Sequence, residues 1–544
     1  MKKEISEIYK LINDKNIDKA YFEAKRLYQI DSENLDIVKI LAFLHIQKSQ
    51  FKSTIDILVN FYEKYPEKKD FDFYANLAVS YKSLEEFENA LAMYQNAREI
   101  NPNSPLCYTV PAEIYVKLRQ YEKANELIDT GISIISNSFS NTIHFPNAIK
   151  LKTEINVALN QDNENEKILL DILDENFNPD IFYLLAIVNS KSIDENLLKK
   201  AESYLKGNSR IYTNKLDRFW YVQPILFGLA LYYSSIDKNK SESYYHLGNN
   251  ETMGSLRYDS FSYQKNINTI IKKYEDAILP LQENQKKVGA NNFFILGTPR
   301  SGTTLIESII GSNKNVFSGG ELLSASSLIQ EYLNKDDGNI DNFIENFSNT
   351  YISRTNYIKG SSQYIIDKLP ENFLFIGYIL KILCGCKIIR TFRNPWDVAI
   401  SLYKQRYVTN IPYSASFFNI GVFMANFEAI NLYWNKNIPE HGKESVLDIH
   451  YEKLVENPED YQKKIYEFLG LNPNDFKEEN RRKFFSQTAS MRQIGAKIHQ
   501  NSLKKEEFLD KKEEFFEAIE MQRGYWRKKG YADDSSTFFG YELK

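Results

Sequence analysis

A short stretch in the second half of the chain limits the fold more than any other feature. It joins an apolar run, a loop bounded by Gly297 and Gly302, and a helical pattern, and over residues 293–310 it reads FFILGTPRSGTTLIESII. A glycine-bounded turn between a buried strand and a helix directs backbone N–H groups at one point, where the helix N-terminus adds partial positive charge. The stretch therefore predicts an α/β domain with an anion site at the end of a strand.

The loop differs from a Walker A loop, G-x-x-x-x-G-K-[ST], at one informative position. Thr303 occupies the place of the lysine, which in that motif contacts the β- and γ-phosphates. The apolar run that starts at Lys387 leads into Arg393, a cation where a metal-binding aspartate would be expected. We therefore expect a site without a metal ion, for transfer of a less charged group such as a sulfuryl group on a nucleotide.

Strand and helix patterns alternate over the rest of the C-terminal part. Apolar runs predict strands at 293–296, 364–366, 387–392 and 446–449. Helical patterns lie at 303–311, 372–383, 396–403 and 458–469. Asn394 and Pro395 supply an N-cap and a first-turn proline for the third of these helices. The alternation predicts a P-loop-like three-layer α/β domain with a parallel sheet.

The N-terminal part shows an internal repeat instead. Residues 74–102 follow the tetratricopeptide spacing W-x2-L-G-x2-Y…A-x3-F…P with Tyr74, Leu77, Ala78, Tyr81, Ala90, Tyr94, Ala97 and Pro102. The same period extends in both directions, so we expect four antiparallel helix pairs over residues 1–138. An irregular helical bundle is the alternative. Stacked pairs form an α-solenoid, whose concave surface is expected to contact a protein or peptide partner.

The expected organisation has three parts. Residues 1–138 form the repeats, and residues 139–285 keep a helical pattern without the period, as degenerate repeats or linker helices. Residues 286–544 form the α/β domain, because the polar stretch before it ends in turn-forming residues. The fold class is therefore α + α/β, an α-solenoid followed by a three-layer domain.

Composition excludes several classes of function. The chain has 544 residues and a net charge of −4, so no global positive field favours nucleic acid or an anionic membrane. Three cysteines cannot make a disulfide framework. The chain has neither an apolar run long enough to span a membrane nor a signal-peptide pattern at its start. We expect a soluble, cytoplasmic protein.

Two anion motifs in this order resemble those of the sulfotransferases that use 3′-phosphoadenosine-5′-phosphosulfate (PAPS). GTPRSGTT at 297–304 is similar to the 5′-phosphosulfate loop of that family, and RTFRNPWDVAISLYKQ at 390–405 to its 3′-phosphate motif. The resemblance covers about residues 290–535 and is greatest to protein-tyrosine sulfotransferases and to bacterial sulfotransferases preceded by tetratricopeptide repeats. It implies transfer of a sulfuryl group from PAPS to an acceptor hydroxyl or amine, with release of 3′,5′-adenosine bisphosphate.

The resemblance also implies roles for particular residues. The 5′-phosphosulfate would be held by Arg300, Ser301, Gly302, Thr303 and Thr304, and the 3′-phosphate by Arg393 and Ser401. The catalytic residues would be Glu321 as general base, Lys368 as the cation that stabilises the transition state, and Ser490 at the start of a late loop. Tyr451 would pack on PAPS, and Lys505 would contact it from the late loop.

Several of these residues also have a structural interpretation. An acid after two glycines, such as Glu321, is favoured at a helix N-terminus. Lys368 has the sequence context of a surface lysine, and Lys505 lies in a charge run typical of a solvated helix face. His450 is the alternative candidate for the base, although its position at the end of a strand favours packing.

The chain departs from the tyrosine sulfotransferases near the acceptor. Leu323 stands where those enzymes carry an arginine two residues after the catalytic glutamate, and Gln405 and Arg406 stand where they carry a further arginine. The acceptor therefore stays open between protein tyrosine, glycan and small molecule. Two other functions also stay open, namely an ATP-dependent kinase and a repeat scaffold with an inactive transferase domain.

Overall fold

The computed structural model separates the chain into two compact units. One unit is Met1–Ile155 with Asn356–Ile358, and the other is Asn156–Thr355 with Lys359–Lys544. The structure describes residues 2–138, 144–208, 215–276, 288–334, 340–408, 411–438, 440–482, 484, 506–532 and 535–543.

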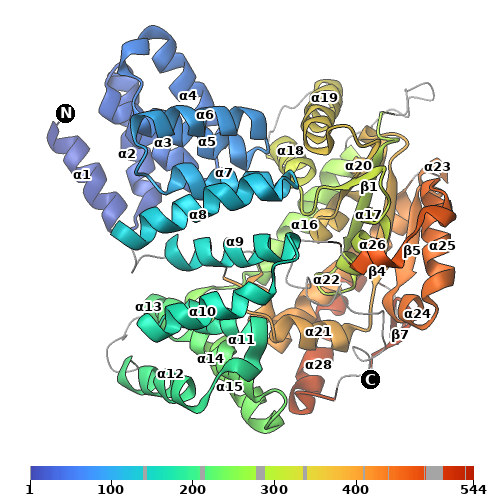
Figure 1. Cartoon of the computed structure of the whole chain (residues 1–544). Coiled ribbons are helices and arrows are strands. Elements are labelled where there is room, and N and C mark those ends of the chain that lie inside the picture. The colour runs from blue at the N-terminus through green and yellow to red at the C-terminus, as the bar shows by residue number, and fades with distance from the viewer. Residues whose placement is uncertain are drawn as a thin grey trace. The chain divides into compact units, whose positions relative to one another are not determined.

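The first unit is a succession of helix hairpins, which Figure 1 shows in blue and cyan. Its helices are α1 (Lys2–Asn13), α2 (Ile17–Ile30), α3 (Leu35–Gln47), α4 (Phe51–Lys64), α5 (Phe71–Ser83), α6 (Phe87–Ile100), α7 (Leu106–Lys117), α8 (Tyr121–Ser138) and the part of α9 (His144–Ala158) up to Ile155. The eight helices from α1 to α8 make the four pairs that the sequence predicts. The fully buried alanines of the repeat, among them Ala78, Ala90 and Ala97, allow the helices to cross closely.

Each pair is closed by the same backbone turn. Its central residue has a left-handed conformation at Lys15 (φ 59°), Ser49 (φ 56°), Glu85 (φ 60°) and Arg119 (φ 56°). The N–H of the following residue then donates to the carbonyl five residues earlier, as in Gln50 N to His45 O at 2.8 Å. This bond satisfies a carbonyl of the last helical turn, which has no partner within the helix. The recurrence of this turn marks the repeat period in the backbone itself.

The second unit contains a five-stranded parallel sheet. Its strands are β1 (Asn292–Gly297), β2 (Val316–Ser318), β3 (Tyr364–Asp367), β4 (Lys387–Phe392) and β5 (Val446–His450). They are arranged in the order β2-β3-β1-β4-β5, and every neighbouring pair is parallel. The predicted parallel sheet is confirmed. The additional strand β2 was not predicted, because three residues are too few to show a strand pattern in the sequence.

Helices cover both faces of this sheet, as the predicted three-layer domain requires. They are α17 (Thr303–Gly311), α18 (Ser324–Leu333), α19 (Ile340–Lys359), α20 (Ile376–Ile382), α21 (Pro395–Tyr403), α22 (Phe417–Asn437), α23 (Glu440–Lys443), α24 (Tyr451–Glu456), α25 (Pro458–Leu469), α26 (Glu478–Arg482) and α28 (Lys512–Arg527). The helix expected over 372–383 begins as a 3-10 helix, Pro370–Phe375, before α20. Its proline lacks an N–H and fixes φ at the first position.

The sheet has its topological switch point between β1 and β4. Ile309 of α17 packs in one core with Phe293 and Ile295 of β1, whereas Ile400 of α21 packs in another core with Phe294, from the opposite face of the strand. The helices that follow these adjacent strands therefore leave to opposite faces. Ligands of open α/β sheets bind in the crevice at such a point, beyond the carboxyl ends of the strands.

The helices before the sheet belong to the same compact unit. They are α10 (Asn163–Glu175), α11 (Pro179–Asn189), α12 (Glu195–Asn208), α13 (Lys215–Tyr221), α14 (Gln223–Tyr233), α15 (Lys238–Ser255) and α16 (Ser260–Asp276). Phe227, Ile270 and Tyr274 share a hydrophobic core with the sheet domain. The ring of Tyr274 lies 4.9 Å from that of Trp434 on α22, so α14 to α16 cover apolar surface of the α/β domain.

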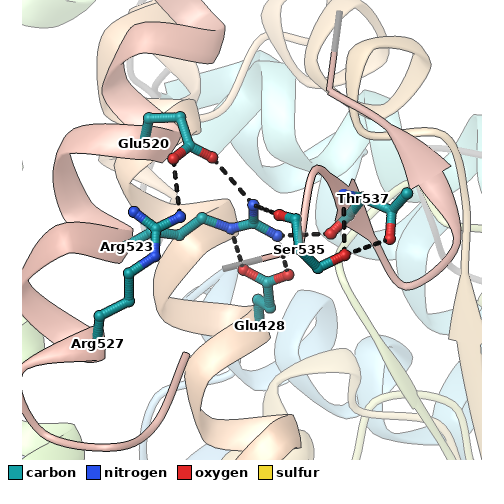
Figure 2. Close-up of polar contacts among 6 residues, drawn as sticks. All are labelled: Glu428, Glu520, Arg523, Arg527, Ser535 and Thr537. Carbon is teal, nitrogen blue, oxygen red and sulfur yellow. Dashed lines mark hydrogen bonds and ion pairs between the residues drawn. The ribbon is translucent and has the colours of Figure 1, made fainter. Parts of the chain in front are cut away.

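A buried ion pair fixes the C-terminal segment to α22 (Figure 2). The guanidinium of Arg523 on α28 donates through Nε to Glu428 at 2.6 Å, and through its other nitrogens to Glu428, Glu520, Ser535 O and Thr537 O. All five N–H groups of the guanidinium are thereby used. Removing one partner of such a pair costs about 3–5 kcal/mol, because it leaves an uncompensated buried charge.

Among the helices of the described residues, none combines the length and hydropathy that crossing a membrane requires.

Candidate active site

A predicted site residue follows the carboxyl end of every strand of the sheet. Arg300 follows β1, Glu321 follows β2, Lys368 follows β3, Arg393 follows β4, and Tyr451 follows β5. Because parallel strands end at the same edge of a sheet, residues spread over about 150 positions of the sequence come to one edge.

The loop after β1 is compact because its two glycines allow close approach. A Cβ on Gly297 (φ 154°) would lie 2.1 Å from Thr391 Oγ1, and one on Gly302 (φ 103°) would lie 2.4 Å from the ring of Tyr451. The Ser301 hydroxyl donates to Thr298 O at 2.6 Å and contacts Thr391 Oγ1. These contacts tie the loop to β4 and hold the start of α17 in place.

Helix α17 begins directly at the loop. Gly302 is its N-cap, and Thr303 and Thr304, both buried, are its first two residues. The N–H groups of Leu305 and Ile306 donate to Gly302 O at 3.0 and 3.2 Å. These bonds start the helix at the loop, so the N-terminus of α17 and the positive end of the helix dipole face the loop, as an anion site requires.

The two predicted anion motifs meet in space. Arg393 Nη1 donates to Arg300 O at 3.1 Å, and Arg300 Nε donates to Ser401 Oγ at 2.9 Å. Arg300 has a left-handed backbone (φ 71°), which directs its side chain from the loop towards α21. Burial lowers the pKa of the Arg300 guanidinium from its ordinary value, and the nearby charge of Arg393 lowers it further. Two cations held this close attract an anion strongly.

Tyr451 completes this part of the site. Its ring lies against Gly302, and the guanidinium carbon of Arg393 lies 4.4 Å from the ring centroid. The ring thus supports the Arg393 side chain through a cation–π contact while it also touches the β1–α17 loop.

The turn after β4 is fixed from the C-terminal segment. The backbone N–H of Asn394 donates to Glu452 Oε1 at 2.8 Å, and the Asn394 side chain caps α21 by accepting from Trp396 N and Asp397 N. Glu452 in turn accepts a hydrogen bond from the hydroxyl of Tyr541 in the terminal strand β7 (Tyr541–Glu542). The cap was predicted, but the contribution of Glu452 and Tyr541 was not, because Glu452 is 58 positions beyond Asn394 and Tyr541 is a further 89 positions beyond Glu452.

The predicted base and the predicted stabilising cation are in direct contact. Lys368 Nζ lies 2.7 Å from Glu321 Oε1 and 3.9 Å from Glu307 Oε2. The Lys368 side chain is 1% exposed, whereas that of Glu321 is 45% exposed. Lys368 is therefore not the surface lysine of its structural interpretation, and Glu321 can be reached by a substrate.

Sequence reasoning missed Glu307. This residue lies on α17, is fully buried, and accepts a hydrogen bond from the Ser318 hydroxyl. It places a second carboxylate behind Lys368. An acid on the apolar face of a helix was the available signal, since Asp and Glu are almost never fully buried unless they are paired.

Three further sequence predictions have different outcomes. Ser490 and Lys505 lie outside the described residues. His450, the alternative base, contacts the Tyr541 hydroxyl through Nδ1 at 3.1 Å and packs against Phe392. Burial lowers the pKa of the His450 imidazole.

Two family models match segments of the chain. Residues 292–475 match the model of the sulfotransferase family, and residues 71–104 match that of the tetratricopeptide repeat. The first match contains the loop after β1, the contact between Lys368 and Glu321, and the Arg393 motif. The chain therefore contains a sulfotransferase-family domain. It combines this domain with a tetratricopeptide repeat at α5 and α6.

Similar proteins were found among curated sequences and solved structures. An uncharacterized protein of Aquifex aeolicus (strain VF5) is 28% identical over 268 residues, which cover 46% of this chain and 35% of that protein. The chain thus spans about a third of the length of this relative. The sulfotransferase domain of the Synechococcus PCC 7002 olefin synthase is 19% identical with a TM-score of 0.29, covering 44% of this chain and 96% of that one. A tetratricopeptide repeat protein from Parabacteroides merdae is 12% identical with a TM-score of 0.30, covering 46% and 92%.

Proposed function

We propose that the protein transfers a sulfuryl group from PAPS to an acceptor hydroxyl or amine, with Glu321 as the general base. The observation that carries the proposal is the meeting of the two anion motifs, in which Arg300 reaches Ser401 and Arg393 reaches the Arg300 backbone. PAPS carries two anionic groups, at the 5′ and 3′ positions, and therefore needs two cationic sites. The site supplies them from the ends of adjacent strands.

The residues of the site fit this substrate in their chemistry. The loop from Arg300 to Thr304 and the start of α17 would hold the phosphosulfate, and Arg393 with Ser401 would hold the 3′-phosphate. Tyr451 offers an aromatic ring between the two arginine-bearing segments. PAPS itself supplies an activated sulfuryl group whose leaving group is a phosphate.

The chain's own residues would then move the proton and stabilise the developing charge. Glu321 takes the proton of the acceptor hydroxyl while the acceptor oxygen forms a bond to sulfur. The bond between sulfur and the 5′-phosphate oxygen breaks, and the negative charge that develops on that oxygen is stabilised by Lys368. The products are the sulfated acceptor and 3′,5′-adenosine bisphosphate, and the proton stays on Glu321 until it passes to water.

Glu307 would act as a positioning residue in this reaction. It faces Lys368 from the interior, while Glu321 faces it from the side open to solvent. A lysine held between two carboxylates keeps its place when the acceptor displaces it from Glu321.

Calorimetric titration of 3′,5′-adenosine bisphosphate and of AMP tests the assignment of the two anion sites. Arg393→Ala should lower the affinity for the bisphosphate about 10–100-fold, the range expected for a charge-assisted hydrogen bond, and leave AMP binding within about threefold. Lys387→Ala, at the other end of the same strand, is the matched control and should change neither affinity. Equal affinity of the wild-type protein for the two nucleotides would remove the proposed role of Arg393.

The metal requirement separates sulfuryl transfer from the kinase alternative. We expect transfer from radiolabelled PAPS to continue in EDTA, because backbone N–H groups and arginines neutralise the charge. Abolition of transfer by EDTA with recovery in Mg²⁺ would instead favour the kinase.

The repeats would serve the same reaction by binding a protein. Four stacked helix pairs provide a surface of the kind that protein and peptide partners use. Comparing transfer to peptide, glycan and small-molecule acceptors by the full chain and by a chain without residues 2–138 tests whether that partner is the acceptor. If the partner is not the acceptor, deleting residues 2–138 should leave transfer unchanged.

A further inference from the structure

A second carboxylate lies beside the proposed base. Glu371 belongs to the 3-10 helix Pro370–Phe375 and follows Lys368 by three residues. Its side chain is half-buried, and the charge acting on it is that of Glu321. Within the part of the chain that the structure describes, the Glu371 carboxyl has neither a hydrogen bond nor an ion pair. The proposed reaction has no use for this group.

Three tyrosines from other parts of the chain are electrostatically coupled to Glu371. Tyr263 lies on α16, and Tyr413 lies on the 3-10 helix Pro412–Ala415. Both rings pack on Phe423, with centroid distances of 5.9 and 3.9 Å. The ring of Tyr258 contacts both, with centroid distances of 6.2 Å to the ring of Tyr263 and 5.6 Å to that of Tyr413. The negative charge of Glu371 raises the pKa of all three hydroxyls in addition to the effect of burial, so all three are close to the carboxyl.

Two of these hydroxyls are buried without a partner. Tyr413 is 2% exposed, and neither its hydroxyl nor that of Tyr263 has a hydrogen-bond partner among the described residues. A buried hydroxyl left unsatisfied costs about 1–3 kcal/mol. Such groups beside an unpaired carboxyl require an explanation, which a bound polar ligand would supply.

The group is continuous with the proposed sulfuryl-transfer site. Tyr407 contributes to the raised pKa of the Tyr413 hydroxyl. The pKa of the Tyr407 hydroxyl is in turn lowered by the charge of Arg300 and raised by that of Glu321. We call Glu321, Glu371, Tyr258, Tyr263, Tyr407 and Tyr413 the tyrosine–glutamate cluster. It extends from Glu321, which follows β2, to Tyr263 on the helix α16, which precedes the sheet.

The charge of the cluster favours a cation. The nearby Lys368 is engaged by Glu321 and Glu307. Arg406 is engaged by Asp180 at 2.9 Å and by Gln223 at 2.7 Å. A carboxyl close to another carboxyl and surrounded by aromatic rings attracts a positively charged group both by charge and through cation–π contacts.

From this arrangement we propose that the tyrosine–glutamate cluster is an acceptor subsite for a protonated amine, with Glu371 as its counter-ion. The acceptor would then carry a hydroxyl for Glu321 and a protonated amine for Glu371. This inference rests on the proposed function, since Glu321 is taken as the base. It excludes acidic peptides as good acceptors, because an acidic side chain would meet two carboxylates.

Binding of the amine should release a proton. Burial, together with the charge of Glu321, raises the pKa of Glu371 to about 7. The titratable groups whose charge is coupled to that of Glu371 are Glu321, Tyr258, Tyr263 and Tyr413, and none of them supplies a positive charge. At pH 7 about half of the Glu371 carboxyls are protonated, and a bound cation ionises them.

Three matched phenols test the subsite by calorimetry on the full chain saturated with 3′,5′-adenosine bisphosphate. They are 4-(2-aminoethyl)phenol, 4-ethylphenol and 3-(4-hydroxyphenyl)propanoate, which differ in charge but little in size. The amine should bind about tenfold or more tightly than the neutral phenol, and the carboxylate most weakly. Titration at pH 7 in buffers of different ionisation enthalpy should show release of about half a proton with the amine only.

Variants of Glu371 identify the counter-ion. Glu371→Gln should abolish both the preference for the amine and the proton release, while the affinity for the bisphosphate stays within about twofold. Glu371→Asp keeps the charge and should keep the preference. Tyr413→Phe should weaken all three phenols by at most about tenfold without altering their order.

Several results would overturn the subsite. They are equal binding of the amine and the neutral phenol, tighter binding of the carboxylate, no binding of any probe, or an unchanged preference in Glu371→Gln. If the protein fails to bind the bisphosphate, the proposed function fails instead. The three probes titrated into the nucleotide-free protein then still test the amine subsite.

Discussion

The repeats and the transferase region both place non-glycine residues in the left-handed conformation, but with different consequences. In the repeats, Lys15 and Ser49 occupy such positions with exposed side chains, and the turn is closed by backbone atoms alone. In the loop after β1, Arg300 occupies one with a side chain that reaches Ser401. Each costs about 1–2 kcal/mol relative to an ordinary conformation. The same backbone feature therefore serves structure or function according to what the side chain contacts.

The two regions also differ in the range of their contacts. A helix pair of the repeats packs mainly on its neighbours along the chain, so that a local change has local consequences. The transferase site depends on residues such as Arg300 and Ser401, which are 101 positions apart. Residues 156–276 could belong to either region by these criteria. Their helical pattern resembles that of the repeats, whereas their core contacts are with the transferase region.

The largest expected effect comes from truncating the chain on either side of these helices. A protein of residues 286–544 loses Phe227, Ile270 and Tyr274 and leaves the surface around Trp434 exposed. We expect it to aggregate or to lack a cooperative unfolding transition, whereas residues 156–544 fold and bind 3′,5′-adenosine bisphosphate. Circular dichroism melting and calorimetry compare the two proteins.

Folding of the shorter protein would place these helices with the repeats instead. If residues 286–544 fold and bind the nucleotide with the affinity of the full chain, the division at residue 285 predicted from the sequence holds. The helices α10 to α16 then act as an extension of the repeats.

The second effect concerns Glu321, whose replacement separates chemistry from binding. Glu321→Gln keeps the shape of the side chain and removes the proton acceptor, so turnover should fall about 10²–10⁴-fold. The affinity for 3′,5′-adenosine bisphosphate should stay within a few-fold, since the carboxylate does not hold the nucleotide. Transfer from radiolabelled PAPS gives the first quantity and calorimetry the second. Loss of both would make Glu321 structural, and normal turnover would assign the base to another group, with His450 tested first.

The sequence predicts those elements that depend on local patterns. The loop from Gly297 to Gly302, the helix that follows it and the Asn394 cap are all set by neighbouring residues, and all are where the pattern predicts them. Glu307 carries a local signal, an acid on the apolar face of a helix, but its contact with Lys368 joins distant parts of the sequence. The coupling of Glu371 to Tyr263 and Tyr413 likewise exists only after the chain has folded.

A smaller effect follows from the carboxyl of Glu371. Its folded-state pKa of about 7 lies above the ordinary value of 4.5, so ionising it opposes folding as the pH rises through this interval. Glu371→Gln should therefore be more stable than the wild-type chain at pH 8, by on the order of 1–3 kcal/mol. The difference should vanish below about pH 4.5, where the carboxyl is protonated in both states. Urea denaturation at pH 8 and at acid pH measures it, and a variant of equal or lower stability at pH 8 would show that Glu371 is paired.

The smallest effect tests the opening comparison directly with a matched pair of glycine substitutions. Ser49→Gly relieves the left-handed strain of an exposed turn residue and should stabilise the repeats by about 1 kcal/mol. Arg300→Gly relieves similar strain but removes the side chain that reaches Ser401, so nucleotide affinity should fall at least tenfold even if the melting temperature rises. Thermal melting and calorimetry on both variants distinguish the two uses. If Ser49→Gly also weakened nucleotide binding, the turns of the repeats would be more than a structural device. If Arg300→Gly bound normally, the left-handed arginine would be no different from the turn residues of the helix pairs.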